Sequence, residues 1–547
     1  MKASELIVRC LEHETVRFLF GLPGEETLEL TDALLNSAVR VITTRHEQGA
    51  AFMADVYGRL TGKAGVCFST LGPGATNLLT GVADANMDRA PLVTITAQAG
   101  LDRMHKESHQ FIDVMAMFKP VTKWQAQITT PAIISEAMRK AFKVAQTEKP
   151  GATHLELPEN VAGSAIGESD LSVPLRVQSP HTPEPLHSHV QRAREVLGRA
   201  ERPLVLAGNG VIRLGAHEAV RRFSRGLKIP VVHTFMGKGI VPDGDPLSLY
   251  TIGFRWRDYS NLAMEQADVI IAVGYDFVEY APCFWNPNRD KRIVHVDVMP
   301  AEVDAHYIVE VGVLGDPALS LDQIGAGLTP FNDQWPKHQR ERLMAGLGGD
   351  RWENSSGPLR PQDIIRALRA ALGQEDIVIC DVGAHKLWMA RMFPCDVPNT
   401  CIISNGFASM GIGLPGAIAA KLAFPERRVV AVTGDGGFLM NVQELETAVR
   451  YRVPIVIVVW RDDGYGVIRW NQMIKFGRPS AVDIGNPDLA KLAESFGAIG
   501  RRVSDLSELE HCLADAFTSD RPVVIDCPVD YSENLKLTER LQKLGHG

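Results

Sequence analysis

The stretch that decides the fold is VVAVTGDGGFLMNVQELETAVRYRVPIVIVVWRDDG, residues 429–464. It opens with the apolar, β-branched run Val429–Val432 and closes with a second such run, Ile455–Trp460. Each run is apolar throughout and too short for a buried helix, so each predicts a strand that is buried on both faces. A helical pattern lies between them. The stretch therefore predicts a strand–helix–strand unit with parallel strands.

The helix of this unit is predicted from its start signal and its apolar stripe. Asn441 can cap the N-terminus, and Glu444, three residues later, would complete a capping box. Leu445, Ala448 and Val449 continue the stripe at helical spacing.

The same alternation of short β-branched runs and amphipathic patterns extends through nearly all of the 547 residues. We therefore predict an α/β fold of three doubly wound parallel-sheet domains, at residues 1–163, 187–326 and 361–547. A Ser/Pro-rich linker and a polar stretch from about Gly327 to Pro361 separate them. The other predicted strands are Val39–Thr43, Val66–Thr70, Leu92–Thr96, Leu204–Ala207, Val269–Val273, Ile293–Val296, Ile377–Cys380 and Val523–Ile525.

Composition argues against several classes of protein. The 57 basic residues are outnumbered by 65 acidic ones, and there is no basic block, so we expect no nucleic-acid partner. No apolar run approaches the roughly 18 residues of a membrane span, and the N-terminus reaches Glu5 without the apolar segment of a signal peptide. The eight cysteines show no C-x-x-C spacing, which argues against zinc sites and a disulfide framework. We expect a cytoplasmic protein without membrane contact.

Two aspartates follow the strands of the opening unit, Asp435 after the first and Asp462 after the second. The carboxyl ends of neighbouring parallel strands share one edge of a sheet, where open α/β sheets bind ligands. Gly434, Gly436 and Gly437 allow backbone N–H groups to approach an anion closely. Two carboxylates beside a diphosphate indicate a hard cation such as Mg²⁺. The pattern alone leaves open a pair of solvated turn aspartates.

The spacing of 27 residues between Asp435 and Asp462 resembles the motif of thiamine-diphosphate enzymes, which is Gly-Asp-Gly followed by a crossover to an Asn or Asp pair. The resemblance implies that Asp435, Asp462 and the Gly464 carbonyl bind Mg²⁺. It also implies a pyrimidine-binding, a central and a diphosphate-binding domain. The residues that it places against the cofactor are Pro23, Gly72, Pro73, Asn77, Val382, Ala384, His385, Ala408, Met410, Gly434, Gly436, Gly437 and Tyr465.

The first domain carries three further motifs that resemble the pyrimidine-binding domain of these enzymes. They are Arg45-His46-Glu47, Leu71-Gly72-Pro73-Gly74-Ala75-Thr76-Asn77, and Asn86-x-x-x-Ala90-Pro91-Leu92. The resemblance implies that Glu47 hydrogen-bonds the cofactor's pyrimidine, so that the cofactor can lose its C2 proton. From pattern alone, Glu47 could equally be an exposed glutamate at a helix N-terminus, and Met410, which would wedge the cofactor into a bent shape, could be a core methionine.

Over nearly the whole chain the resemblance is closest to acetolactate synthases of the FAD-independent, catabolic type. It rests on His109-Gln110 with Ala116-Met117-Phe118-x-Pro120-Val121-Thr122-Lys123, on Gly274-Tyr275-x-x-Val278-Glu279-Tyr280-x-Pro282, and on the tail Pro528-Val529-Asp530-Tyr531-Ser532-Glu533-Asn534. The resemblance implies that Gln110 lies near the reacting carbonyl. His109 would bind a substrate carboxylate or serve as a structural histidine.

No FAD is expected. The turn Gly208-Asn209-Gly210 with Gly215 is a poor dinucleotide fingerprint, because its third glycine is misplaced. The segment Gly274-Tyr275-Asp276-Phe277-Val278-Glu279-Tyr280 lacks the arginines that the FAD-containing relatives carry there.

The resemblance implies decarboxylation of pyruvate and its carboligation to a second pyruvate, which gives 2-acetolactate and CO₂. Glu25 and Glu26 fall in a loop that approaches the reacting end of the cofactor in this family. They leave open another carboligase, or a 2-keto-acid decarboxylase, with a different donor or acceptor; otherwise they are solvent-facing glutamates that open a helix. A cofactor-binding protein without catalysis is the rival from another class. In the family the first and third domains meet between subunits, so we expect a homodimer at minimum and a homotetramer as the assembly.

Overall fold

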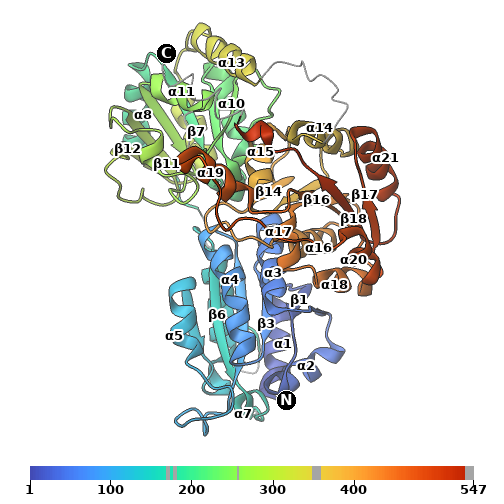
Figure 1. Ribbon diagram of the computed structural model, residues 1–547. Helices are drawn as coiled ribbons and strands as arrows, with labels where there is room; N and C mark the ends of the chain where they lie inside the picture. The colour runs from blue at the N-terminus through green and yellow to red at the C-terminus, as the bar shows by residue number, and fades with distance from the viewer. Residues whose placement is uncertain (168–172, 176–181, 255–257, 348–358, 536–547) are drawn as a thin grey trace.

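The computed structural model describes residues 1–167, 173–175, 182–254, 258–347 and 359–535. The chain forms three α/β domains, each built on a parallel sheet of six strands with helices on both faces (Figure 1). This confirms the predicted fold class. Most predicted strands are present, with ends within one or two residues of the predicted ones. Two of them, Val269–Val273 and Ile377–Cys380, have the predicted bounds.

The N-terminal domain has strand order β2-β1-β3-β4-β6-β5. Its strands are β1 (Phe18–Gly21), β2 (Arg40–Thr43), β3 (Gly65–Ser69), β4 (Leu92–Gln98), β5 (Trp124–Gln127) and β6 (Ala152–Pro158). Its helices are α1 (Ala3–His13), α2 (Leu28–Ala33), α3 (Glu47–Thr61), α4 (Pro73–Met87), α5 (Val114–Phe118), α6 (Ile134–Gln146) and α7 (Glu159–Ala162).

The central domain has strand order β12-β11-β10-β7-β8-β9. Its strands are β7 (Pro203–Ala207), β8 (Val231–Thr234), β9 (Ser248–Ile252), β10 (Val269–Val273), β11 (Arg292–Asp297) and β12 (Val309–Leu314). Its helices are α8 (His187–Gly198), α9 (Gly210–Arg213), α10 (His217–Leu227), α11 (Tyr259–Gln266), α12 (Pro317–Gly325) and α13 (Gln334–Gly346). Helix α13 lies within the predicted polar linker and packs on α11 and β9, where Arg340 donates to the Ser248 and Asp243 carbonyls.

The C-terminal domain has strand order β14-β13-β15-β16-β18-β17. Its strands are β13 (Ile377–Cys380), β14 (Cys401–Ile403), β15 (Val429–Gly434), β16 (Val456–Arg461), β17 (Ile499–Arg502) and β18 (Val523–Pro528). Its helices are α14 (Pro361–Ala371), α15 (Ala384–Met392), α16 (Gly413–Ala423), α17 (Asp435–Met440), α18 (Glu444–Arg450), α19 (Gly466–Phe476), α20 (Leu489–Ser495) and α21 (Leu506–Ala516).

The predicted strand–helix–strand unit is present, but its helix starts elsewhere. Helix α17 begins at Asp435 itself, directly after β15, and Asn441 is its C-terminal cap. A second helix, α18, begins at Glu444 with Gln443 as its N-cap. The predicted capping box between Asn441 and Glu444 is therefore wrong: the Asn441 amide donates to the Gly411 carbonyl at 2.9 Å instead.

One hydrophobic core runs through the N-terminal and C-terminal domains. It joins Phe52 and Met53 of α3 to Leu414 and Ala417 of α16, and all four are buried. Helix α3 is buried on nearly every face, and its charged residues Asp55 and Arg59 pair with each other. Figure 1 shows α3 where the two domains meet. The placement of one domain against the other within the chain is thus set by close helix packing.

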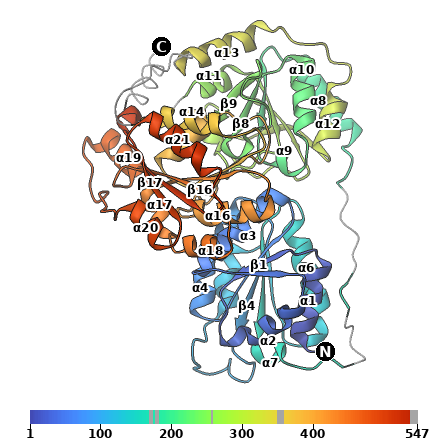
Figure 2. The same ribbon diagram turned by 90° about the vertical axis from the view of Figure 1, so that its right-hand side faces the viewer.

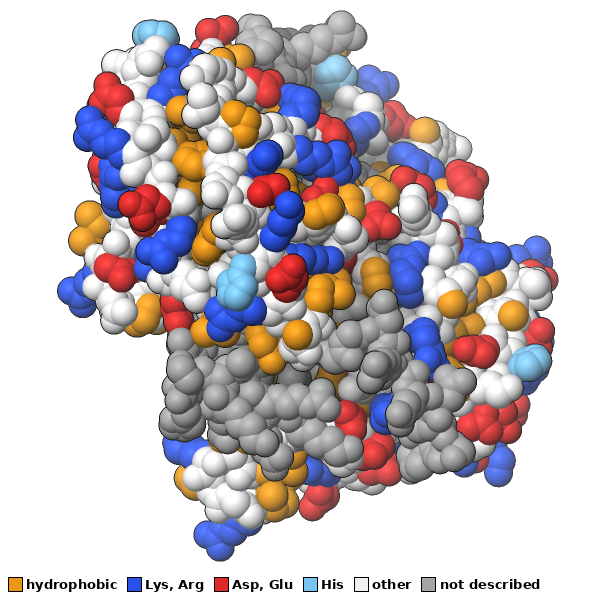
Figure 3. All heavy atoms as spheres, turned by 90° about the horizontal axis from the view of Figure 1, so that it is seen from above, with side chains coloured by type: hydrophobic (Ala, Val, Ile, Leu, Met, Phe, Trp, Pro, Cys, Tyr) orange, Lys and Arg blue, Asp and Glu red, His pale blue; other side chains and the backbone are white. Residues whose placement is uncertain are grey.

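In the view from above, Lys and Arg side chains are interspersed with Asp and Glu over the described part of that face (Figure 3). Across the described ranges, no helix combines the length and the apolar character needed to cross a membrane. All eight cysteines are free. In the view turned by 90°, the central domain lies above the N-terminal domain (Figure 2).

Close packing between α3 and α4 generates a stability prediction. A Cβ atom on Gly81 would lie 2.5 Å from the Ala51 Cβ, so Gly81→Val should lower the free energy of unfolding by about 1–3 kcal/mol through overpacking. The matched control is Gly198→Val, because a Cβ at Gly198 meets nothing within 4 Å. Denaturant unfolding of both variants checks this; equal stabilities would contradict it.

Candidate functional site

A cavity of about 480 Å³ lies at the carboxyl edge of the C-terminal sheet. Strands β13, β15 and β16 are neighbours there, and residues that directly follow each of them line the cavity. Phe235, Gly253 and Phe254 of the central domain line it as well. The cavity brings together the following predicted residues: Val382, Ala384, His385, Ala408, Met410, Gly434, Asp435, Gly436, Gly437, Asp462, Gly464 and Tyr465.

The two predicted metal ligands stand at the ends of adjacent strands. Gly434 of β15 is the register partner of Trp460 of β16, so Asp435 and Asp462 emerge side by side. Asp435 is 1% exposed, and its carboxylate accepts from the Asp463 N–H and the Asn486 amide, each at 2.8 Å. Burial raises the pKa of Asp462 to about 7, with repulsion from Asp435 as the next cause. These are not solvated turn aspartates.

The donor set fits a hard divalent cation. Two carboxylates and the Gly464 carbonyl are oxygen ligands of the kind that Mg²⁺ takes together with phosphate oxygens. The Asn486 Oδ1 atom is buried and has no hydrogen-bond partner among the described residues, so a further oxygen lies beside Asp435. No group of three or more His, Cys, Asp or Glu side chains forms an alternative metal site in the described part of the chain. A cation here would therefore bind chiefly through Asp435, Asp462 and a bound ligand's phosphates.

Helix N-termini provide the anion-binding side of the cavity. Helices α15 and α19 begin at Ala384 and Gly466, and both residues line the cavity. Free N–H groups and the helix dipole favour a phosphate at such positions. His385 is buried, and burial lowers its pKa to about 3, so its imidazole is neutral. Its Nε2 atom lacks a partner among the described residues, which fits a polar ligand in the cavity.

The loop between β14 and α16 carries Ala408 and Met410 to the cavity. Ala408 has a φ of +57°, a left-handed conformation that non-glycine residues rarely adopt. Met410 is half-buried and lies close to Gly436, where an added Cβ would be 3.4 Å from the Met410 Cε. Met410 therefore faces the cavity and is not a core methionine. Asp381 fixes the far end of the loop, because its carboxylate accepts from the N–H groups of Gly411 and Gly413 at 2.9 Å each.

The N-terminal domain holds Glu47 at the first turn of α3, 5% exposed. The Asn77 amide of α4 donates to the Glu47 Oε2 at 2.9 Å, and an added Cβ on Gly74 would lie 3.3 Å from Oε1. The alternative of an exposed glutamate is therefore wrong. A buried carboxylate held by an amide donor, with one oxygen left over, can bind a proton of a ligand's ring.

The other predicted residues of this domain surround the turn before α4. Gly72 has a φ of +46°, which glycine tolerates, and caps the helix whose first residue is Pro73. A Cβ at Gly72 would meet the Gln110 carbonyl at 2.5 Å, so Gln110 lies against this turn. Pro23, His109 and Gln110 are all exposed. Within one chain, none of the predicted residues of the N-terminal domain lines the C-terminal cavity.

Three family models match the chain in order. They are the N-terminal thiamine pyrophosphate (thiamine diphosphate) binding domain over residues 1–117, the central domain of thiamine pyrophosphate enzymes over 190–324, and their C-terminal binding domain over 381–527. The chain is 37% identical to an acetolactate synthase of Bacillus subtilis, over 99% of this chain and 96% of that protein. It is 34% identical to a catabolic acetolactate synthase of Raoultella terrigena, over 98% and 97%.

The chain belongs to the acetolactate synthase family of thiamine pyrophosphate enzymes. Its likeness extends beyond bacteria: a probable acetolactate synthase large subunit of Methanocaldococcus jannaschii is 36% identical, over 98% of this chain and 93% of that protein.

Four residues at or beside the candidate site were not predicted from the sequence. Asn486 donates to the Asp435 carboxylate. Asp381 accepts from the Gly411 N–H at the end of the Met410 loop. Asp88 and Glu444 bind backbone N–H groups across the interface between the N-terminal and C-terminal domains. Asp88 is an unassigned position within the motif Asn86-x-x-x-Ala90-Pro91-Leu92, none of the motifs quoted above includes Asn486 or Asp381, and for Glu444 the sequence suggested a helix cap.

If Asp435 and Asp462 bind Mg²⁺, removal of one of these two carboxylates should weaken Mg²⁺ binding. Asp435→Asn removes one of two anionic ligands, so the Mg²⁺ concentration required for thiamine diphosphate binding should rise at least tenfold. Titration of the cofactor at increasing Mg²⁺, followed by protein fluorescence, measures this. Asp520→Asn, an exchange of the same kind at an exposed loop position, is the control. An unchanged Mg²⁺ requirement in Asp435→Asn would refute the assignment.

Proposed function

We propose that this chain catalyses the thiamine-diphosphate- and Mg²⁺-dependent decarboxylation of pyruvate and its carboligation to a second pyruvate, giving 2-acetolactate and CO₂. The observation that carries the proposal is the cavity that unites every predicted cofactor and metal residue of the C-terminal domain. Likeness to acetolactate synthases over 98–99% of the chain supports the same reaction. We place the reaction in the cytoplasm, as the sequence predicts.

Each group in the cavity has a physical task in this reaction. The N-termini of α15 and α19 would hold the diphosphate, and Asp435 and Asp462 would hold the Mg²⁺ that neutralises it. Met410, which lines the cavity, would support the cofactor in its bent shape. When bound, thiamine diphosphate supplies the carbon nucleophile and the electron sink for the loss of CO₂. Glu47 would donate or accept the proton at the pyrimidine ring that sets the acidity of the reacting carbon.

A second copy of the chain would complete the site. The cavity is lined only by residues 235–531, whereas Glu47 and Asn77 pair with each other in the N-terminal domain. The exposed residues Pro23, His109 and Gln110 border the same turn as Gly72. If this surface of one chain covers the cavity of another, Glu47 and Gln110 reach the cofactor. We therefore propose a homodimer as the minimal active unit and a homotetramer as the assembly, with Gln110 positioning the substrate carbonyl and His109 its carboxylate.

Glu25 and Glu26, in the loop that contains Pro23, affect which acceptor substrate the chain could use. Glu26 accepts from the Thr70 hydroxyl at 2.7 Å, and Glu25 is exposed. Neither forms an ion pair among the described residues that would neutralise it. Their charge favours an uncharged acceptor over a second pyruvate anion if they face the reacting carbon. A carboligase with a different acceptor is for that reason the second candidate.

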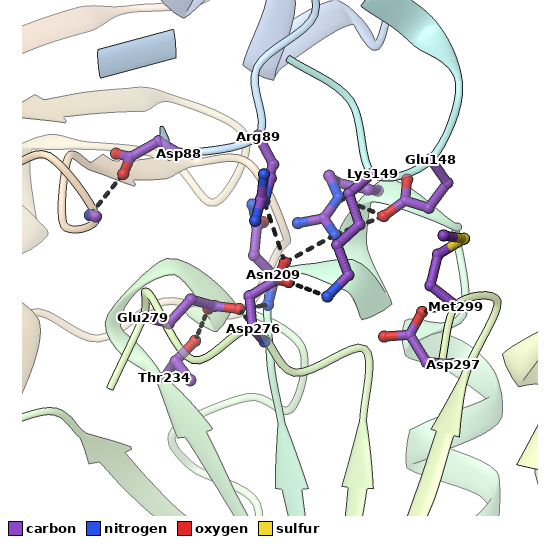
Figure 4. Close-up of polar contacts among 12 residues, drawn as sticks. Asp88, Arg89, Glu148, Lys149, Asn209, Thr234, Asp276, Glu279, Asp297 and Met299 are labelled. Carbon is purple, nitrogen blue, oxygen red and sulfur yellow. Dashed lines mark hydrogen bonds and ion pairs between the residues drawn. The ribbon is translucent and has the colours of Figure 1, made fainter. Parts of the chain in front are cut away.

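Flavin independence is part of the proposal, because the Glu279 carboxylate binds the glycine turn of the central domain. The Asn209 N–H donates to both oxygens of Glu279 at 3.1 Å, and the Thr234 hydroxyl binds the same carboxylate (Figure 4). An added Cβ on Gly208 would lie 2.8 Å from the Glu279 Oε1. A dinucleotide's phosphate would have to displace this carboxylate and overcome its charge.

Exchange of the catalytic carboxylate tests the function. Glu47→Gln should bind thiamine diphosphate and Mg²⁺ with unchanged affinity and lose roughly 10²–10⁴-fold in turnover, the usual contribution of a positioned acid–base group. Product analysis with pyruvate alone, and with pyruvate plus aldehydes or other keto acids, identifies donor and acceptor. Glu29→Gln, at a carboxylate paired on the surface with Lys2, is the control. Wild-type protein that forms no acetolactate from pyruvate would disprove the proposed reaction.

The purified protein should carry no flavin. Its visible spectrum is expected to lack the absorbance of an oxidised flavin, and added FAD should change neither its activity nor its thermal unfolding temperature, because Glu279 already binds the turn. A stoichiometric flavin in the purified protein would overturn the proposal of flavin independence.

A further inference from the structure

The loop that carries Met410 needs support from outside its own domain. Residues 404–410 form no helix or strand, and Ala408 is held in the left-handed region, a conformation that a non-glycine residue keeps only when its surroundings fix it. Lys386, 7% exposed, donates to the Ser404 carbonyl at 2.9 Å. The Asn405 side-chain amide donates to the Glu279 carbonyl of the central domain at 2.6 Å. The other anchors described below come from the N-terminal domain.

Asp88, at the C-terminal cap of α4, is the main anchor of this loop. It is fully buried, and its carboxylate accepts from three consecutive N–H groups: Asn405 at 3.0 Å, Gly406, and Phe407 at 3.3 Å. Figure 4 shows the Asp88 side chain directed at this loop. A buried carboxylate that loses such donors is costly, so Asp88 and the loop hold each other in place.

Asp84, one turn earlier on α4, holds both ends of the loop. Its carboxyl group accepts from the Ser404 hydroxyl at 2.9 Å and from the Ser409 N–H at 3.1 Å. Arg59 of α3 donates to Asp55, Asp84 and Asp88 together, at 2.6–2.7 Å. Burial and the neighbouring carboxylates of Asp88 and Asp55 raise the pKa of Asp84 well above its ordinary value.

In the opposite direction, a carboxyl group of the C-terminal domain holds the turn that carries Glu47 of the N-terminal domain. Glu444, the first residue of α18 in the C-terminal domain, is fully buried. Its carboxyl group accepts from the N–H groups of Arg45 at 3.2 Å and His46 at 3.0 Å, and from the Thr447 hydroxyl at 2.7 Å. These N–H groups immediately precede Glu47, so Glu444 fixes the turn from which α3 begins.

Other residues of the same segment brace the strand that leads into this turn. The Thr43 N–H donates to the Tyr451 hydroxyl at 2.9 Å, and Arg450 donates to the Thr43 carbonyl at 2.6 Å. The β2–α3 turn is therefore held at several points by α18 and the residue that follows it.

We propose that Asp88 and Glu444 are positioning residues, and that each domain uses a buried carboxylate to hold the catalytic element of the other: Asp88 the Met410 loop, and Glu444 the turn that carries Glu47. This inference rests on the proposed roles of Met410 and Glu47. Neither carboxylate lines the cavity, so both act through the backbone that they bind.

The test for Glu444 is the rate at which the C2 proton of bound thiamine diphosphate exchanges with deuterium, measured by NMR after acid quenching. Glu444→Ala should slow this exchange about tenfold or more through misplacement of Glu47, with cofactor affinity unchanged. Glu444→Gln keeps an oxygen for both N–H groups and should restore most of the rate. If Glu444→Ala does not fold, Glu444→Asp, whose shorter side chain withdraws the acceptor, should show the same loss. Wild-type exchange in the Ala or Asp variant would overturn the role of Glu444.

The test for Asp88 uses a control from its own cluster. Asp88→Asn leaves one oxygen for the three N–H groups and should slow the exchange about tenfold and alter the near-ultraviolet circular dichroism of the bound cofactor. Asp55→Asn changes a carboxylate that binds the same Arg59, with no hydrogen bond to residues 404–410 among the described contacts, and should change neither. If Asp88→Asn does not fold, Asp88→Glu, whose longer side chain displaces the acceptor from the three N–H groups, is expected to slow exchange several-fold. Equal effects of the Asp88→Asn and Asp55→Asn variants, or no effect of Asp88→Glu, would overturn the role of Asp88.

The exchange reaction needs no pyruvate, so its outcome separates the two proposals. Wild-type protein that exchanges normally but makes another product would disprove only the proposed reaction. Normal exchange in both positioning variants would disprove only the roles of Asp88 and Glu444.

Discussion

A carboxylate removed from water must receive hydrogen-bond donors or a cation, and this requirement shapes the protein wherever its parts meet. Asp88 and Glu444 are satisfied by backbone N–H groups of the opposite domain, and Glu279 by the glycine turn of its own domain. Asp435 accepts from the N–H groups of Gly436 and Asp463 and from the Asn486 amide, and Asp462 pairs with Arg469, yet burial still raises the pKa of both carboxyl groups. We propose that a bound cation meets the rest of this requirement at these two carboxylates.

The interdomain carboxylates also explain how residues that we propose for the site can lie on irregular backbone. Ala408 and Gln110 both have positive φ, and Glu47 begins a helix directly after a turn. Such segments are usually mobile unless the surroundings fix them. Here the shared core of α3 and α16 holds the two domains together, so that each domain offers the other a rigid set of acceptors. In a dimer that pairs Glu47 of one chain with Met410 of the other, the anchors of a single chain would support two different sites.

The strands and the position of the two aspartates could be predicted because both depend on local sequence pattern. The strands β15 and β16 follow from apolar runs, and the pairing of Asp435 with Asp462 follows from the parallel topology. The anchors were not predictable, because Asp88 and the N–H group of Asn405 lie 317 residues apart, and Glu444 and that of His46 lie 398 apart. Glu444 was predicted to cap its own helix, but the same carboxylate instead accepts from a distant turn. Local propensity could not decide between these partners; the packing of α3 against α16 does.

The central claim is that a working site takes Glu47 from one chain and the metal-binding cavity from another. Subunit exchange between two inactive variants, Glu47→Gln and Asp435→Asn, tests it most directly. In a mixed dimer one site carries both defects and the other carries neither, so random mixing should restore about a quarter of the wild-type activity. If tagged mixed dimers are isolated and remain inactive, both groups act within one chain, and the account of the site is wrong.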